Sequence, residues 1–448
     1  MAGTSGLESI STRLRQVAEL ARQRPRMVIT TLAHHIDMDW MLEAHRRTRK
    51  DGAVGVDDVT AEAYAADLQG NLAGLLERFK AGTYVAPPVR RVHIPKGDSG
   101  ATRPIGIPTF EDKILQRAVA MVLGAVYEQD FLDCSYGFRP GRSAHQALER
   151  LWKGLMDLRG GWVIDLDLAS FFDTLDHRHL RQFLDQRVRD GVIRKAIDKW
   201  LAAGVMSEGH VSRSTTGTPQ GGVISPLLAN IYLHEVLDLW FEHDVTPRMQ
   251  GAASLVRYAD DAVLVFAERR DAERVLDVLP KRLGKYGLTL HAEKTRLVPF
   301  DRPRKRPGER GDDGPRPGTF NFLGFTHYWG ATRTGSWAVK RKTEAGRFRR
   351  AVRAVNLWCR YNLHAGVAAQ HRMLSAILRG HFGYYGIAGN CFAIGAFRQR
   401  VQQIWRYWLA LRSQKAKMTW TRFGALRQRY PLPPARIVHR VSPAAASP

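Results

Sequence analysis

The chain has 448 residues, 44% of them hydrophobic, and a formal net charge of +25. This length suits roughly three domains, and no apolar run reaches the roughly 20 residues of a membrane span. The first residues lack the apolar core of a signal peptide, and the three scattered cysteines predict neither a disulfide framework nor a zinc site, so we expect a cytoplasmic protein without a membrane partner.

The positive charge is concentrated near the C-terminus. Residues 331–448 hold 22 lysines and arginines but one acid, Glu344, whereas residues 1–330 hold 46 basic and 42 acidic residues. A solvated basic face normally mixes both signs of charge. The missing acids therefore favour a polyanionic partner such as nucleic acid.

In chain order, helical spacing of apolar residues predicts helices over 1–75, with a turn in GAVGVDDVT and one amphipathic helix from Tyr64 to Leu76. VRRVHIPK and RPIGIP then predict two strands joined by GDSG, which expose Lys96 and Arg103. These two cations suit either an ordinary basic loop or a clamp for a triphosphate. A helix is expected from about Glu111.

The segment GGWVIDLDLASFFDTLDH, residues 160–177, predicts a buried strand that carries acids. Asp165 and Asp167 share one face of this strand, and apolar residues occupy the other. Asp173 and Asp176 follow the strand, where they suit the cap of a helix that begins near His177.

STTGTPQGGVISPLLANIYL, residues 214–233, predicts a Gly-rich turn before an apolar helix. Its glycines let the backbone approach a ligand closely, and the start of the helix offers free N–H groups. Further on, GLTLHAEKTRLVPF predicts strand, turn and strand with Lys294 near the turn, and FNFLGFTHYW predicts a strand.

Between these segments, LVRYADDAVLVF predicts a tight hairpin with Asp260 and Asp261 at its tip. Adjacent carboxylates at the end of buried strands are electrostatically costly unless a cation lies between them. Aspartate is also a good turn residue, so a plain turn and a metal site are both open at this point.

The last domain opens with a basic helix near residues 343–363. Its apolar face carries Phe348, Val352, Val355 and Cys359, and its polar side carries arginines that we expect to bind RNA: Arg347, Arg349, Arg350 and Arg353. Tryptophans 405, 408 and 420 follow among further arginines. They suit core packing, and some could stack on bases.

If Asp167 faces Asp260 and Asp261 across one sheet, three carboxylates could hold two hard divalent cations. Two such ions clamp the attacking and departing oxygens of an in-line phosphoryl displacement. With a basic hairpin, a Gly-rich turn and a basic helical domain beside it, this arrangement predicts nucleotidyl transfer on a nucleic acid.

Nearly the whole chain resembles the reverse transcriptases encoded by bacterial group II introns, the intron maturases. The resemblance rests on the order of RRVHIPKGD, TRPIGIPTFEDK, DCSYGFRPGRSAHQAL, WVIDLDLASFFDTLDH, GTPQGGVISPLLANIYL, RYADDAVLVF and GLTLHAEKTRLV. It implies an α+β right-hand polymerase with fingers, a palm on a small antiparallel sheet with packed helices, and an all-helical basic thumb. The implied boundaries are a helical extension over 1–75, fingers and palm over 76–327, and thumb and maturase segment over 328–448.

The same resemblance implies roles for single residues. Asp167, Asp260 and Asp261, with the backbone carbonyl of Leu168, would bind two catalytic Mg²⁺ ions, and Asp165 would not be a ligand. Phe172 would exclude a ribose 2′-hydroxyl, so the product would be DNA. The incoming nucleotide would also meet four further residues: Lys96, Arg103, Gln220 and Lys294. The implied partners are an RNA template or intron RNA, a DNA primer or target, and dNTPs; oligomeric state is left open.

The sequence departs from the family at two places. Asp58 stands where the family often has glycine, and the printed sequence reaches Pro448 without a cysteine-pair, HNH-like endonuclease segment. From the latter we expect mobility through single-stranded or replicating DNA targets. The alternatives to a polymerase that is also a maturase are a splicing cofactor with incidental polymerase activity and a domesticated relative in host defence or repair.

Overall fold

The computed structural model describes residues 3–95, 102–207, 210–212, 217, 221–305, 307, 317–412 and 418–439. The chain divides into two compact units, each described here by itself. Unit 1 comprises Met1–Ala147, Leu166–Leu264 and Glu268–Arg296, and unit 2 comprises Leu148–Asp165, Val265–Ala267 and Leu297–Pro448. No helix among the described residues is long and apolar enough to cross a membrane.

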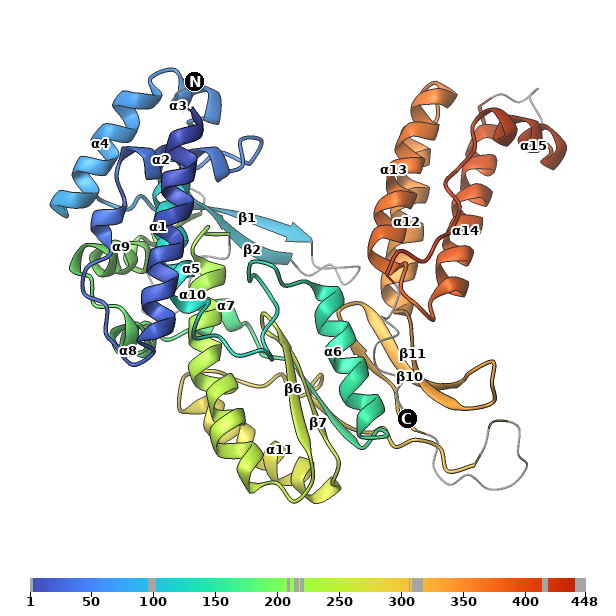
Figure 1. The fold of residues 1–448 in the computed structure, drawn as a ribbon. Helices are drawn as coiled ribbons and strands as arrows, with labels where there is room; N and C mark the ends of the chain where they lie inside the picture. The colour runs from blue at the N-terminus through green and yellow to red at the C-terminus, as the bar shows by residue number, and fades with distance from the viewer. Residues whose placement is uncertain are drawn as a thin grey trace. The chain divides into compact units, whose positions relative to one another are not determined.

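Unit 1 is built around helix α5 (Phe110–Tyr127), against which α1 (Gly3–Gln23), α2 (Met38–Arg47) and α10 (Ser225–Leu233) pack. Leu115, Val119 and Val122 of α5 are completely buried, as expected for a helix that is apolar on nearly all sides. The unit also contains η1 (Ala33–His35), α3 (Ala61–Ala65), α4 (Leu68–Ala81), α7 (Phe171–Thr174), α8 (His177–Arg187), α9 (Gly191–Ala202) and α11 (Arg269–Gly284). Figure 1 shows these helices in blue to yellow.

Helix caps decide where several of these helices begin. The prediction of one helix from Tyr64 to Leu76 is wrong, because Asp67 interrupts it and caps α4 by accepting a hydrogen bond from the Gly70 N–H, 3.1 Å away. The predicted role of Asp176 is confirmed, since it caps α8 by accepting from the His179 N–H at 3.0 Å.

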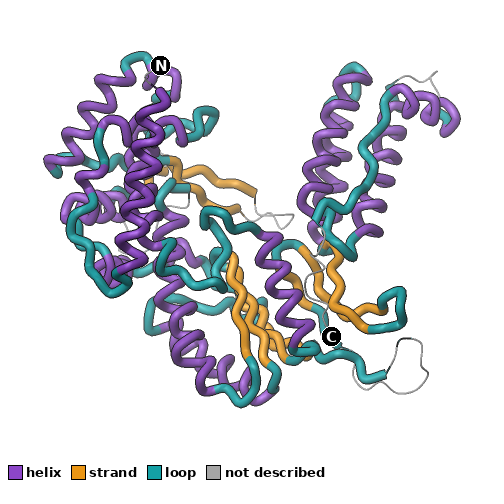
Figure 2. Tube along the Cα trace, in the orientation of Figure 1, coloured by secondary structure: helices purple, strands orange, loops and turns teal. Residues whose placement is uncertain are grey.

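The first sheet of unit 1 contains the predicted basic hairpin. Strands β1 (Val89–Pro95) and β2 (Thr102–Ile107) pair antiparallel, and the sheet order is β2-β1-β4-β5, with β4 (Val205–Ser207) and β5 (His210–Ser212). Figure 2 shows this orange hairpin extending beyond the helices that flank its base. The segment that joins the two strands lies outside the described residues.

A second sheet has the order β6-β7-β3-β8, with β6 (Ala253–Tyr258), β7 (Asp261–Phe266), β3 (Trp162–Leu166) and β8 (Arg296–Pro299). From Val263 to Phe266, β7 is completely buried, which explains its unbroken apolar sequence. Before β6, α10 continues through the π-helical segments η2 (His234–Asp238) and η3 (Phe241–Val245) and the 3-10 turn η4 (Thr246–Arg248).

Unit 2 includes most of helix α6 (Ala144–Asp157), a sheet of order β11-β10-β9, and four further helices. The strands are β9 (Phe320–Phe322), β10 (Phe325–Ala331) and β11 (Trp337–Thr343), and the helices are α12 (Ala345–Tyr361), α13 (Val367–Tyr385), α14 (Cys391–Ala410) and α15 (Trp420–Arg429). In Figure 1, α12, α13 and α14 lie side by side in orange and red. Their shared core includes Val355, Leu378, Val401 and Trp405.

Two predictions about unit 2 are corrected. FNFLGFTHYW forms two strands, because Leu323 and Gly324 adopt the left-handed conformation with φ of 50° and 78° and reverse the chain. The segment 328–448 is also not all-helical, since β11 lies within it. The inward residues of β11 are Val339, Arg341 and Thr343, and the polar side chains among them hide the alternating apolar pattern of a strand.

Candidate active site

The turn between β6 and β7 carries the paired acids. Ala259 adopts the left-handed conformation, with φ of 57°, and is buried; Asp260 is half-buried, and Asp261 is exposed at the start of β7. A non-glycine residue in this conformation needs support from its surroundings. The segment that contains Tyr136 and Gly137 supplies this support. The Tyr136 N–H donates to the Arg257 carbonyl at 2.9 Å, and a Cβ on Gly137 would lie 2.3 Å from the Ala259 nitrogen. Only glycine permits this approach.

Arg257 fixes the turn from inside the protein. Its guanidinium is completely buried and forms a two-pronged ion pair with the buried carboxylate of Asp238, with Nε to Oδ1 at 2.7 Å and Nη2 to Oδ2 at 2.5 Å. Nη1 donates to the Ala259 carbonyl and to Asn230 Oδ1, both at 3.0 Å, and Nη2 donates to the Ser135 hydroxyl at 2.8 Å. The guanidinium thus holds the backbone directly before Asp260.

The environment keeps both members of this pair charged. Burial opposes the charges, but their mutual attraction outweighs it, so the pKa of Asp238 lies below its ordinary value and the pKa of Arg257 lies above. The carboxylate of Asp260 makes a smaller contribution to the raised pKa of Arg257. Arg257 is therefore electrostatically linked to the candidate site as well as to the core.

Asp167 follows β3 directly, and its backbone is tied to a second segment. The Ala169 N–H donates to the Thr289 carbonyl at 2.8 Å, and the His291 N–H donates to the Asp167 carbonyl at 2.9 Å. Neither bond uses the carbonyl of Leu168. The predicted strand before Lys294 is reduced to an isolated bridge between Leu168 and Leu290.

The same backbone pairing brings Lys294 to Asp167. The Lys294 ammonium lies 3.2 and 3.3 Å from the two Asp167 carboxylate oxygens. Both side chains are partly exposed, 49% and 32%, so this ion pair is weak and open to competition by another cation.

Sheet order relates Asp167 to the paired acids. Strands β3 and β7 are hydrogen-bonded neighbours. A Cβ on Gly161, just before β3, would lie 2.2 Å from the carbonyl oxygen of Phe266, the last residue of β7. The two strands therefore run antiparallel, and the end of β3 points toward the start of β7, where Asp261 lies. Within the described ranges, no three His, Cys, Asp or Glu side chains are already grouped as a metal site.

The chemistry of the donors nevertheless fits hard divalent cations. Carboxylate and backbone carbonyl oxygens are the ligands that Mg²⁺ and Ca²⁺ prefer. The half-buried Asp167 and Asp260 and the exposed Asp261 leave carboxylate oxygen within reach of solvent.

Phe172 is buried in α7, edge-to-face with Phe171 at 5.3 Å between ring centroids. The described part of the Gly-rich turn packs against this segment. The Gly217 N–H donates to the Leu175 carbonyl at 2.7 Å, and a Cβ on Gly217, with φ of 90°, would lie 3.1 Å from the Phe172 carbonyl oxygen. Phe172 thus lies beside the start of the turn that also contains Gln220.

The remaining predicted nucleotide contacts are only partly described. Arg103 is exposed on β2, opposite Ile94 of β1. Lys96 and Gln220 lie outside the described residues. Next to Gln220, a Cβ on Gly221, with φ of 117°, would lie 2.4 Å from the Gly106 carbonyl oxygen, so the Gly-rich turn touches the basic hairpin.

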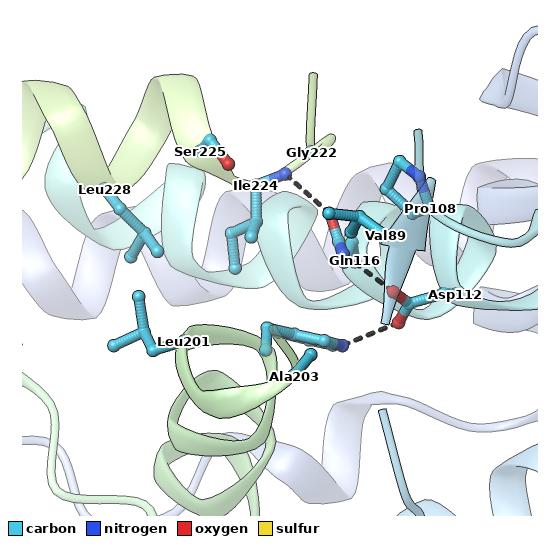
Figure 3. A pocket seen from close by; sticks show the side chains of 11 residues that line it. Val89, Pro108, Asp112, Gln116, Leu201, Ala203, Gly222, Ile224, Ser225 and Leu228 are labelled. Atoms are coloured by element: carbon cyan, nitrogen blue, oxygen red, sulfur yellow. Dashed lines mark hydrogen bonds between the residues drawn. The ribbon is translucent and has the colours of Figure 1, made fainter. Parts of the chain in front are cut away.

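A buried polar network supports the end of this turn, and the sequence did not predict it. Gln116 of α5 accepts hydrogen bonds from the N–H groups of Val223 and Ile224, at 2.7 and 3.3 Å, and donates to Asp112 at 3.1 Å. The Trp200 indole N–H donates to the same carboxylate at 2.7 Å, and the Tyr84 hydroxyl also donates to it. Figure 3 shows Gln116 and Asp112 in this arrangement.

Asp112, Gln116 and Trp200 of this network line part of a small cavity of about 10 Å³, enough for one water at most. Burial raises the pKa of the Asp112 carboxyl to about 6, although the three hydrogen bonds oppose this shift. Two polar residues one helical turn apart on the buried side of α5 were the available sequence signal for Asp112 and Gln116. For Arg257, the signal was a charge within an apolar strand.

In unit 2, the four predicted RNA-binding arginines lie on α12. Arg347, Arg349 and Arg353 are exposed and Arg350 is half-buried. Arg347 lies 3.8 Å from the carboxylate of Glu344. The four are therefore not equivalent.

Comparisons with known proteins agree on one protein family. The model of the family described as "Reverse transcriptase (RNA-dependent DNA polymerase)" matches residues 94–327, more than half of the chain. The chain is 35% identical to Protein YkfC of Escherichia coli K12 over 328 residues, which cover 64% of this chain and 84% of that protein. It is 40% identical to the group II intron-encoded protein LtrA of Lactococcus lactis over 182 residues, 41% of this chain but 30% of LtrA. Nuclear intron maturase 4 of Arabidopsis thaliana is 27% identical over 210 residues, 44% of this chain and 23% of that protein.

Proposed function

The chain belongs to the reverse transcriptase family, the RNA-dependent DNA polymerases, and we propose that Asp167, Asp260 and Asp261 form its catalytic centre. It is a group II intron-type reverse transcriptase with a maturase role, as the likeness to LtrA and to an intron maturase supports. The observation that carries the proposal is the antiparallel pairing of β3 and β7 inside the matched region, with one acid directly after β3, one in the turn before β7 and one at the start of β7.

The family uses divalent metal ions, and we propose two Mg²⁺ ions held by the three carboxylates and the Leu168 carbonyl. When bound, such ions acidify a primer 3′-hydroxyl and neutralise charge on a triphosphate. The protein's own part is to fix the ligands: Arg257 holds the turn before Asp260, and the Leu290 segment holds the backbone of Asp167. Lys294, already at the Asp167 carboxylate, would supply a proton or positive charge to the departing pyrophosphate.

The substrates proposed for this centre are an RNA template, a DNA primer and dNTPs. Lys96, Arg103 and Gln220 would contact the incoming nucleotide, and Phe172 would exclude its 2′-hydroxyl. The contact between Gly221 and Gly106, and that between Gly217 and the Phe172 backbone, support this grouping, because they bring the basic hairpin, the Gly-rich turn and Phe172 to one part of unit 1.

The domain layout is part of the same proposal. Residues 1–75 would be the N-terminal extension, 76–327 the fingers and palm, and 328–448 the thumb and maturase segment. In the last of these, Arg347, Arg349, Arg350 and Arg353 would contact RNA phosphates. A bacterial cytoplasmic location remains a prediction from the sequence.

Metal-dependent cDNA synthesis on a primed RNA template tests the enzymatic proposal. Wild-type protein should extend the primer in Mg²⁺, and Asp167→Asn and Asp260→Ala should each abolish extension. Asp165→Asn is the matched control, because Asp165 lies two residues before Asp167, in β3, but is not a proposed ligand, and it should remain active. Activity that survives Asp260→Ala would contradict the proposal. Splicing of a group II intron that contains the gene tests the maturase role separately. The Asp260→Ala protein should still promote this splicing.

A further inference from the structure

Unit 2 contains a groove of about 850 Å³ along α12 and α14, with α15 contributing Trp420. We call it the basic groove. Arg349 and Arg353 line it from α12, and Arg400, Arg406 and Tyr407 line it from α14. Arg349 and Arg353 are four residues apart and lie on one face of α12. Arg400 and Tyr407 are seven residues apart and likewise lie on one face of α14. The groove is thus a consequence of how the two helices present these faces.

The charge of the groove has one sign. Its described lining contains four arginines and no acid. The single acid in residues 331–448, Glu344, lies by Arg347 instead, which does not line the groove. Four guanidinium groups around one concave surface favour a ligand with several negative charges.

The aromatic residues of these helices fall into two classes. Trp405 is completely buried and its indole N–H donates to Gln370, and Trp408 donates to Asn356. Core packing accounts for both. Trp420 and Tyr407, in contrast, are 54% and 53% exposed and line the groove. The Arg406 guanidinium lies 4.3 Å from the centre of the Trp420 ring, which holds this ring at the groove.

We propose that the basic groove binds an unpaired segment of RNA, with bases stacked on Trp420 and Tyr407 and phosphates paired with Arg349, Arg353 and Arg400. The inference rests on the proposed function in that RNA is taken as the nucleic acid this protein handles. Arginine charge alone would suit a duplex as well. Exposed aromatic rings favour a single strand, because only unstacked bases offer their faces for stacking.

The groove also divides the arginines of α12. Arg349 and Arg353 line it, whereas Arg347 and Arg350 do not. Substitutions at the first two should therefore affect binding of a single strand more than substitutions of exposed arginines elsewhere in unit 2.

Binding of a short, unstructured RNA that carries 2-aminopurine tests the proposal. The full chain with Asp260→Ala is used, so that catalysis does not contribute, and affinity and fluorescence are followed over a range of salt concentrations. Trp420→Ala and Tyr407→Ala should each weaken binding on the order of tenfold and remove part of the fluorescence quenching that stacking causes. Trp420→Phe keeps a ring at this position and should retain most of the quenching, which guards against a folding defect.

The charge part of the proposal has its own control. Arg349→Ala with Arg353→Ala should reduce the slope of log affinity against log salt by about 0.7 for each RNA phosphate that no longer pairs with an arginine. Arg360→Ala with Arg379→Ala removes the same charge from exposed positions outside the groove and should change the slope much less.

Several results would overturn the inference: unchanged quenching in both aromatic variants, equal effects of the two arginine pairs, tighter binding of the DNA oligonucleotide of the same sequence, or equally efficient displacement by duplex RNA or by polyglutamate. If wild-type protein binds the RNA as described but makes no cDNA, the polymerase proposal fails and the groove stands.

Discussion

Arg257 shows how one side chain can couple the core to the candidate active site. Its guanidinium satisfies Asp238, Asn230 and Ser135 and also holds the Ala259 carbonyl, whose left-handed conformation turns the chain into Asp260. A buried ion pair contributes little net stability compared with a well-packed apolar pair. We therefore regard Arg257 as a positioning residue for the acidic turn.

Substitution of this pair separates stability from positioning. Arg257→Leu should lower the free energy of unfolding by about 3–5 kcal/mol, because the buried Asp238 carboxylate loses its guanidinium partner and keeps only His234, 3.8 Å away. The double variant Arg257→Leu, Asp238→Leu should recover most of that loss in urea unfolding. Its cDNA synthesis should stay on the order of 100-fold below wild type, because the turn has lost its donor. Recovery of both stability and activity in the double variant would show that Arg257 acts on stability alone.

At the scale of elements, the fold brings together segments that are distant in the sequence. The Gly-rich turn depends on α5 through Gln116 and Asp112, on the hairpin through Gly106, and on the α7 segment through Gly217. A turn held at three places can keep a fixed backbone surface for a ligand. This accounts for the two polar residues, Asp112 and Gln116, on the buried side of α5.

The Asp112 network predicts a specific pH dependence of stability. With the folded-state pKa raised to about 6 and an unfolded value near 3.9, the folded state binds the proton more tightly. The contribution of Asp112 to the unfolding free energy is therefore greatest below about pH 4, falls as pH rises to about 6, and is constant above.

Urea unfolding of wild type and Asp112→Asn between these pH values measures that contribution. The stability of wild type relative to the variant should decrease as pH rises, by no more than roughly 3 kcal/mol. The asparagine does not titrate, so differences from other groups cancel. A difference that is independent of pH would mean that Asp112 titrates normally.

The sequence predicted elements best where one local signal was sufficient. The β6–β7 hairpin, the basic hairpin, α5 and α12 follow from apolar periodicity and turn residues, and Asp176 follows from its capping position. It failed where a polar residue is buried or a turn is unusual: Arg341 disguises β11, Leu323 divides β9 from β10, and Asp67 divides α3 from α4. Periodicity does not anticipate the first two features, because distant partners stabilise them: Arg341 donates to the Leu148 carbonyl, and the Tyr384 hydroxyl donates to the Leu323 carbonyl. The Asp67 cap is local, but it lies within a continuous helical pattern of apolar residues.

The same division applies to the candidate site. The chemical type of Asp167, Asp260 and Asp261 was apparent from the sequence, as was the class of polyanionic substrate. The order β7-β3 was not, because strand pairing across almost 100 residues depends on the whole fold. Arg257, Asp112 and Gln116 were missed for the same reason, since their significance lies in what they contact.

At the scale of the whole molecule, the proposed catalytic acids and the concentrated basic charge belong to different units. The three acids and their supports belong to unit 1, and the basic groove belongs to unit 2. A polymerase needs both a centre for transfer and a surface that retains its template. The charge asymmetry of the chain agrees with this separation of tasks.

The central claim is that Asp167 and the Asp260–Asp261 turn hold the same metal ions. Fe²⁺ in place of Mg²⁺, with ascorbate and peroxide, produces hydroxyl radicals that cut the protein backbone close to the bound ion. In wild-type protein we predict cuts in both segments, near residue 167 and near residue 260, with excess Mg²⁺ suppressing both together, and Asp260→Asn with Asp261→Asn should abolish the cut near 167 as well. Cleavage confined to one segment, or a cut near 167 that persists in that variant, would contradict a shared metal site.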